Sequence, residues 1–185
     1  MEALLKEYDQ KMEKTLKSLE KELSKIRTGR ANLSLFDDIK VEYYGTPTPL
    51  KQLATMAIPE TRLITIQPWD TNIIGEIEKA ILKSDLGVTP ANDGKVIRIT
   101  LPRLTEERRK DLVKIVKKKG ENSKVSIRNI RREANEKIKS MEKKKEISQD
   151  DMKRMQEKIQ ELTDSKIEKI DKILAEKEKE IMEIS

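Results

Sequence analysis

The first 28 residues alternate apolar and charged positions with the spacing of one face of an α-helix. Apolar side chains recur at steps of three or four residues, which places them on a single stripe: Leu5, Tyr8, Met12, Leu16, Leu19, Leu23 and Ile26. The pattern predicts a helix from about Glu2 to Thr28, with Gly29 as its stop.

Two further helices are predicted in the second half of the chain. Thr105 is a good N-cap, followed by Glu106 and Glu107 at the positive end of the helix dipole. Ser148 and Asp151 have the spacing of a capping box that opens a third helix. The predicted stripes are Leu112, Ile115, Val116, Ile127, Ile130, Ala134, Ile138 and Met141 on the second helix, and Met152, Met155, Ile159, Leu162, Ile170, Leu174 and Ile181 on the third.

No single one of these helices can bury its own apolar stripe, so the three are expected to pack together as an elongated bundle. The short connection at residues 145–148 makes the second and third helices antiparallel neighbours. Gly120 interrupts the second helix, and we interpret it as a glycine tolerated inside a well-packed helix in preference to a functional kink.

The middle of the chain has a different pattern. All six prolines and four of the six glycines lie there, which excludes long helices. Residues 38–43, 63–67 and 96–101 predict strands, Asn92-Asp93-Gly94 predicts a tight turn, and residues 73–81 predict a short amphipathic helix.

The fold class is therefore α+β: an antiparallel three-helix bundle, residues 1–29 and 106–185, with an inserted small head, residues 31–104. The chain crosses between the two at hinges near 29–31 and 102–105, formed by Gly29, Arg30, Ala31, Pro102, Arg103, Leu104 and Thr105. Because the three stripes can satisfy one another within one chain, we expect a monomer.

Composition excludes several kinds of chemistry. The chain has 185 residues with no cysteine and no histidine, so disulfides, thiolate nucleophiles and the usual neutral-pH general base are missing. No apolar run approaches the ~20 residues that span a bilayer, and the amino end lacks a signal peptide's apolar stretch. We expect a cytoplasmic protein that is not an enzyme, needs no cofactor or metal and takes no small-molecule substrate.

Positive charge is concentrated on the second helix. Residues 105–145 contain sixteen Lys or Arg and seven Asp or Glu, a net of +9, whereas the whole chain carries +6. Lys110, Lys114, Lys117, Lys124, Arg128 and Arg131 follow steps that align them over roughly 32 Å of helix, with Arg109 and Arg132 beside the row. An even row of cations on a rigid helix suits the phosphate backbone of RNA, although a solvated charged face is the simpler alternative.

Five stretches together carry a resemblance. They are Lys-Ile-Arg-Thr-Gly-Arg-Ala at 25–31, Val-Glu-Tyr-Tyr-Gly-Thr-Pro-Thr-Pro-Leu at 41–50, Ser-Asp-Leu-Gly at 84–87, Leu-Thr-Glu-Glu-Arg-Arg-Lys at 104–110 and Val-Ser-Ile-Arg-Asn-Ile-Arg-Arg-Glu-Ala-Asn at 125–135. In this order and spacing, the chain resembles the bacterial ribosome recycling factors over its whole length.

The resemblance implies an L-shaped protein of transfer-RNA-like dimensions that binds the large ribosomal subunit and its ribosomal RNA after termination. It also implies elongation factor G as a partner, whose GTP hydrolysis helps to split the ribosome from messenger RNA. Arg109, Arg128 and Arg131 match the arginines that the family uses on the ribosome, and Arg27 and Arg30 match its motif near the hinge.

Two other functions remain as alternatives. A coiled-coil interaction or chaperone-like protein would use its apolar stripes on protein partners, and its binding would be insensitive to salt. An enzyme housed in the head would need a pocket with convergent polar groups, for which the sequence offers no candidate constellation.

Overall fold

The computed structural model describes residues 1–183 of the chain. Two compact units make up the fold: one contains Met1–Leu23 and Lys110–Met182, and the other contains Ser24–Arg109 and Glu183. The elements in chain order are α1 (Glu2–Ser24), η1 (Leu33–Phe36), β1 (Lys40–Tyr43), β2 (Thr46–Pro49), η2 (Leu50–Gln52), β3 (Ala54–Glu60), β4 (Leu63–Pro68), η3 (Thr71–Ile73), α2 (Ile74–Lys83), β5 (Pro90–Asn92), β6 (Ile97–Thr100), α3 (Glu106–Lys143) and α4 (Gln149–Met182).

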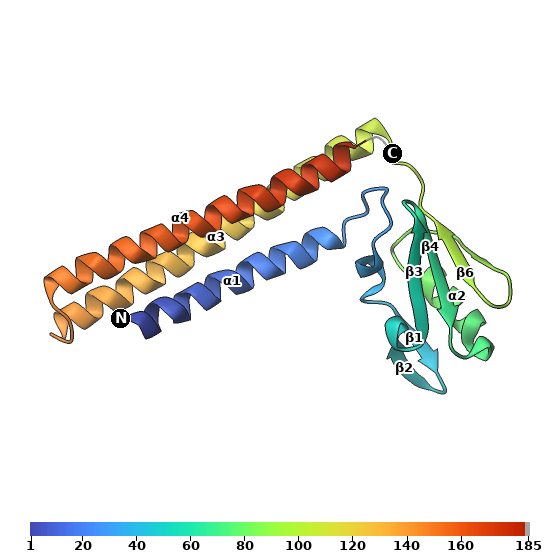
Figure 1. The fold of residues 1–185 in the computed structure, drawn as a ribbon, viewed down its shortest axis with the longest axis horizontal. Helices are drawn as coiled ribbons and strands as arrows, with labels where there is room; N and C mark the ends of the chain where they lie inside the picture. Colours follow the sequence, from blue (N-terminus) through green and yellow to red (C-terminus); the bar gives the residue numbers. More distant parts are fainter. Residues whose placement is uncertain (184–185) are drawn as a thin grey trace. The chain divides into compact units, whose positions relative to one another are not determined.

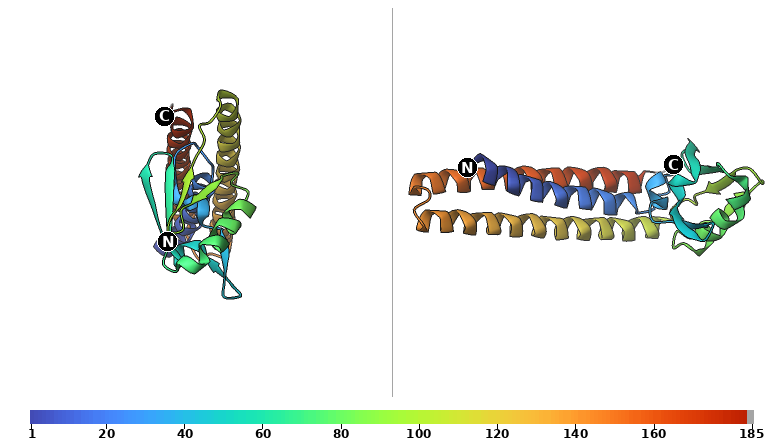
Figure 2. Two further views of the ribbon diagram at one scale, coloured as in Figure 1. Left: turned by 90° about the vertical axis from the view of Figure 1, so that its right-hand side faces the viewer. Right: turned by 90° about the horizontal axis from the view of Figure 1, so that it is seen from below.

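In the first unit, α1, α3 and α4 run side by side as a three-helix bundle (Figures 1 and 2). One end of the bundle is closed by a cluster to which each helix contributes two buried side chains: Leu4, Tyr8, Ala134, Ile138, Met155 and Ile159. The bundle and the antiparallel pairing of α3 with α4 confirm the prediction from the apolar stripes.

The predicted helix starts are also confirmed. The Thr105 hydroxyl accepts a hydrogen bond from the Arg108 amide at 3.1 Å, which caps α3. Ser148 and Asp151 form a reciprocal capping box, because the Asp151 amide donates to Ser148 Oγ at 3.0 Å and the Ser148 amide donates to Asp151 Oδ2 at 3.5 Å.

Two details of the predicted bundle are wrong. The first helix ends at Ser24 instead of Thr28, where the Asn32 side-chain amide donates to the Ser24 carbonyl at 3.2 Å and satisfies the helix end. Ile115 is 39% exposed and does not join the core, because a position just before Val116 lies about 100° around the helix from it.

Gly120 lies at a close contact between α3 and α4, which gives this glycine a structural role. It is buried, and a Cβ built on it would lie 2.2 Å from Leu174 Cδ1 and 2.9 Å from Leu174 Cγ of α4. The missing side chain therefore makes the space into which Leu174 packs. This geometry agrees with glycine inside a well-packed helix and gives it a structural reason.

Three polar side chains occupy core positions of α4: Thr163, Lys166 and Lys177. Thr163 is satisfied by donating to the Ile159 carbonyl at 2.8 Å. Lys166 is only 5% exposed and forms ion pairs with Asp9, at 2.8 Å, and with Glu13 of α1. A buried ammonium is tolerated only when charged partners replace its water, and these two carboxylates do so.

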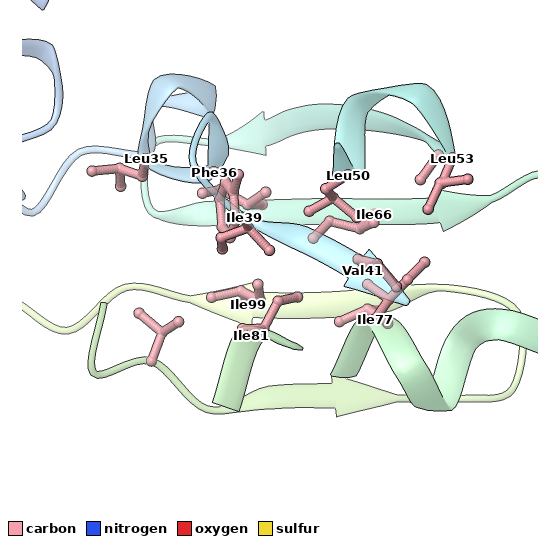
Figure 3. Packing of buried hydrophobic residues seen from close by; sticks show 14 of the residues in the cluster. Leu35, Phe36, Ile39, Val41, Leu50, Leu53, Ile66, Ile77, Ile81 and Ile99 are labelled. Carbon is pink, nitrogen blue, oxygen red and sulfur yellow. The ribbon is translucent and has the colours of Figure 1, made fainter. Parts of the chain in front are cut away.

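The second unit contains a four-stranded antiparallel sheet with the strand order β3-β4-β6-β5 and a separate β1-β2 hairpin. Ile64 and Ile66 of β4 and Ile97 and Ile99 of β6 are buried, whereas Thr65, Arg98 and Thr100 between or beside them are not. This alternation places one face of the sheet on the core (Figure 3), where α2 contributes Ile77 and Ile81.

The sequence patterns predicted β1, β4, β6 and α2 at nearly the observed positions, but they missed β2, β3 and β5. β2 contains Pro47 and Pro49, which pair with Glu42 and Lys40. Proline is compatible with this strand because a two-stranded hairpin leaves an edge on which no amide hydrogen is needed.

Candidate nucleic-acid interface

The basic row of α3 can be divided by what each cation contacts. Val116, Ile127 and Ala134 mark the buried side of the helix. The cations on one flank meet α1, some on the other flank meet α4, and the rest lie on the outer surface. Only the last group is available to a phosphate backbone without first giving up an ion pair.

Cations on the flank toward α1 are used in the bundle. Lys119 pairs with Glu22 at 3.3 Å and Lys137 pairs with Glu7 at 3.6 Å. In a third pair, Glu133 accepts a hydrogen bond from the Lys11 ammonium of α1 at 2.9 Å. These pairs join residues distant in sequence and hold α1 against α3.

Lys124 is used on the flank toward α4. Its side chain is only 14% exposed and its ammonium lies 2.6 Å from Asp171 and 3.5 Å from Glu121. The hydrogen bond to Asp171 raises the pKa of Lys124, against the opposing effect of burial. Spacing placed Lys124 in the RNA-binding row, but the structure shows it holding α3 to α4.

Arg131 contacts α4 but keeps hydrogen-bond donors for a phosphate. It is half-buried and donates to Gln160 Oε1 of α4 at 3.4 Å, and Gln160 in turn donates to Asp164 at 2.9 Å. A guanidinium has five N–H donors, so this one long hydrogen bond leaves donors for a phosphate. The bond also fixes the direction of the side chain.

The outer surface carries the remaining cations of the row. Lys114, Lys117 and Arg132 are exposed, and Arg128 is half-buried. Lys110 is exposed as well, but it also has an interaction within the fold. Arg132 donates to Asn129 at 3.5 Å. No ion pair joins Lys114, Lys117 or Arg128 to an acid within residues 1–183, so their charge is not neutralised by the described part of the fold. Lys118 is exposed beside them and was missed by the stepwise count; the run of three lysines at 117–119 was the available signal.

The other predicted site arginines have structural contacts in the second unit. Arg109 is half-buried at the start of α3. Arg27 donates to the Leu86 carbonyl at 3.0 Å, which ties the chain before the head to the loop after α2. Arg30 pairs with Glu183 at 2.9 Å. Arg27 and Arg30 therefore have roles in the fold that the motif alone did not reveal.

The two predicted hinge segments lie against each other. Gly29 has a φ of +85°, and a Cβ on it would lie 3.7 Å from Leu104 Cγ and 4.0 Å from the Pro102 carbonyl. Glycine adopts this left-handed conformation without strain. Farther into the head, the Ala31 amide donates to the Thr61 carbonyl at 2.6 Å and the Leu101 amide donates to Arg62 at 2.8 Å.

Other features of residues 1–183 bear on metal binding, membrane insertion and small-molecule clefts. They contain no group of three or more carboxylates, histidines or cysteines placed to hold a metal ion. Among the same residues, none of the α-helices combines the length and the hydropathy that a bilayer-spanning segment requires. A cleft of about 380 Å³ in the head is lined by Glu60, Thr61, Arg62, Leu63 and Thr100, which include no thiol or imidazole.

Comparison with known proteins gives a consistent result. The family model described as ribosome recycling factor matches residues 19–182. The ribosome-recycling factor of Oleidesulfovibrio alaskensis is 59% identical over 184 residues, which cover 100% of both chains. That of Syntrophus aciditrophicus is 60% identical over 178 residues, 96% of each chain.

Solved structures show the same similarity. A solution structure of the ribosome recycling factor aligns with a TM-score of 0.79 at 46% identity, covering 99% of this chain and 97% of the other. A chain from models of the T. thermophilus ribosome recycling factor and E. coli elongation factor G bound to the E. coli post-termination complex aligns with a TM-score of 0.67 at 47% identity, covering 98% of each chain. With its fold, its basic helix and its sequence matched along nearly the full length, the chain belongs to the ribosome recycling factor family.

Proposed function

We propose that the protein binds ribosomal RNA of the large subunit after termination through the outer surface of α3. Together with elongation factor G, and with GTP hydrolysis by that partner, it splits the post-termination complex and releases the ribosome from messenger RNA. The observation that supports this most directly is the sorting of cations on α3. Those facing α1 and α4 are paired, while Lys114, Lys117 and Arg128 carry uncompensated charge on the outside.

Rigidity of the bundle supports the same function. Ion pairs join all three helices: Lys137 with Glu7, Lys166 with Asp9 and Lys124 with Asp171. A helix held from two sides can present its outer cations in fixed positions, which lowers the entropy lost on binding RNA. The same stiffness would allow force applied to one part of the bundle to reach its RNA contacts.

The hinge supports a division of labour between the two units. The bundle would serve as the anchor, and the head would move when elongation factor G acts on it. Backbone hydrogen bonds hold Ala31 and Leu101 to the β3–β4 turn, so bending is expected in the few residues outside these two points. The chain itself would not hydrolyse GTP, and its place of action would be the cytoplasm, where post-termination ribosomes are found.

Co-sedimentation with isolated large subunits across a salt series tests the proposal. Arg128→Ala removes an uncompensated cation, so it should weaken binding about tenfold and reduce the steepness of the salt dependence. Lys137→Ala is the matched control, because it removes a cation of the same helix that already pairs with Glu7 on α1. Equal binding by both variants, or affinity that does not respond to salt, would refute an RNA-binding face on α3.

A further inference from the structure

Two aromatic side chains of the head are exposed to solvent. Tyr44 is 76% exposed and Trp69 is 68% exposed, more than any other large apolar side chain within the described residues. The whole chain has only five aromatic residues. Tyrosine and tryptophan contribute strongly to folding when buried, so leaving two of five outside the core gives up that contribution.

The two rings are held in place by hydrogen bonds. The Tyr44 hydroxyl donates to Asp70 Oδ2 at 3.2 Å, and the Trp69 indole donates to Thr55 Oγ1 at 2.9 Å. Tyr43 also packs edge-on against Tyr44, with ring centroids 4.6 Å apart. Since Asp70 directly follows Trp69, both rings belong to one end of the head, where β4 leads into α2. Rings fixed in this way lose little further freedom when a partner binds.

The backbone of Tyr44 supports a role outside the fold. Tyr44 and Gly45 form the turn between β1 and β2, with φ values of +48° and +81°. Asn or Gly normally occupies the first of these positions, because a larger side chain is strained there. The exposed Tyr44 ring does not offset this strain by core packing, and strain kept on the surface points to a binding function.

Charge separates this surface from the RNA-binding face. Residues 31–104 contain eight Lys or Arg and nine Asp or Glu, whereas residues 105–145 carry a net charge of +9. Asp70 directly follows Trp69 in the chain, and its carboxylate accepts hydrogen bonds from the Tyr44 hydroxyl at 3.2 Å and from the Asn72 amide at 3.0 Å. An anion fixed beside the rings repels phosphate and attracts a cation.

We propose that Tyr44, Trp69 and Asp70 form a second docking surface, which receives an arginine or lysine side chain of a protein partner. The cation would meet the Asp70 carboxylate, and the adjoining apolar atoms would cover the rings; aromatic faces also attract cations directly. This proposal rests on the proposed function only in placing the partner among the components of the post-termination complex.

Photo-cross-linking of the intact protein tests the surface. The cross-linker p-benzoylphenylalanine is placed at position 44 or 69, with position 82 as the control, because Leu82 is an exposed apolar residue elsewhere on the head. Each protein is irradiated with post-termination ribosomes and elongation factor G. Positions 44 and 69 should cross-link to protein, within a few residues of an arginine or lysine, and position 82 should not.

Two substitutions separate docking from folding. Asp70→Asn keeps a good N-cap and an acceptor for Tyr44 but removes the charge, so it should lower the cross-link yield from position 69 about fivefold. Glu76→Gln is the control, because it removes an exposed charge of the same head. Tyr44→Asn suits the turn, so it should leave the melting temperature unchanged or raised while splitting of ribosomes slows.

Cross-links from positions 44 and 69 to RNA alone would overturn the proposal, as would a yield no greater than that from position 82. Co-sedimentation of the same samples reports on the proposed function separately. If the protein sediments with ribosomes but the two positions give no protein cross-link, only the docking surface is refuted. If it does not sediment with them, the proposed function fails and the docking surface fails with it.

Discussion

The buried Lys166 provides the sharpest test of how the bundle is held together. Its side chain is only 5% exposed, and its ammonium is the shared partner of Asp9 and Glu13 on α1. Lys166→Met keeps the length and apolar stem of the side chain but removes the charge. The variant therefore leaves two carboxylates of α1 facing an uncharged side chain of α4.

The size of the effect follows from how deep each partner lies. Losing one member of a fully buried pair costs about 3–5 kcal/mol. Asp9 and Glu13 are only half-buried, so water replaces much of the lost interaction, and Met recovers some burial energy. We expect Lys166→Met to lower the free energy of unfolding at pH 7 by about 1–2 kcal/mol. Lys169→Met is the control, because Lys169 is exposed and lies 3.7 Å from Glu13, and it should change stability by less than about 0.5 kcal/mol.

The difference should depend on pH. The hydrogen bond from Lys166 holds the pKa of Glu13 below its ordinary value of 4.5. A carboxyl with a lowered pKa stabilises the fold above 4.5, and this contribution disappears as the pH falls below that value. Burial alone would lower the pKa of Lys166, but hydrogen bonds to Asp9 and Glu13 raise it above 10.5, so the contribution of the cation is complete at neutral pH.

Urea unfolding followed by circular dichroism at 222 nm, where the bundle helices dominate, measures both variants between pH 3 and pH 7. Wild type and Lys166→Met should differ most at pH 7 and converge in acid. Greater stability of Lys166→Met at pH 7 would show that desolvation of the ammonium outweighs its pairing. A difference that does not change with pH would refute the role of the carboxylates.

Three further outcomes are expected. Gly120→Ala should destabilise the bundle by up to about 2 kcal/mol in thermal unfolding, because the clash with Leu174 exceeds the gain in helix propensity; in a Leu174→Ala background the same change should become stabilising. Ser148→Ala should cost about 1 kcal/mol in urea unfolding through loss of the cap on α4, while Ser148→Asp should not. The Asp93 carboxylate accepts hydrogen bonds from the Val96 amide, the Arg98 side chain and the Lys95 amide, and these bonds hold its pKa far below the usual range. Asp93→Ala removes them, so the β6 amides should be less protected from hydrogen exchange in this variant. In wild type the protection of these amides should not change with pH above about 4, because Asp93 stays ionised there.

Most of the bundle was predictable because the signals that define its helices lie within short stretches of sequence. Apolar spacing identifies a helix wherever it repeats, and Ser148 with Asp151 marks a helix start through contacts within one turn. The polar core of α4 was not predictable in this way. Lys166 occupies a position of the apolar stripe, and only the arrival of Asp9 and Glu13 from the other end of the chain makes a lysine suitable there.

The candidate site shows the same limit. Steps of three and four residues align Lys124 with Arg128, but side chains spaced in this way still cover a broad arc of the helix surface. The packing of α4 decides which edge of that arc is buried. Lys124 lies on the buried edge, because it contacts Asp171 of α4. In the head, β2 was not predicted because its two prolines argue against a strand. Proline is acceptable there only because β2 has an unpaired edge, and the sequence does not show which strands lie at an edge.

The insertion of the head into the bundle has a consequence for synthesis of the chain. Apart from Glu183, the second unit is one continuous stretch, Ser24–Arg109, which can fold as soon as about 110 residues have left the ribosome, while the partners of α1 are made last. Lys11 must wait 122 residues for Glu133, and Glu13 must wait 153 residues for Lys166. A nascent chain therefore carries the apolar face of α1 uncovered through most of its elongation, and the many charges of that helix would keep it soluble until α3 and α4 close over it.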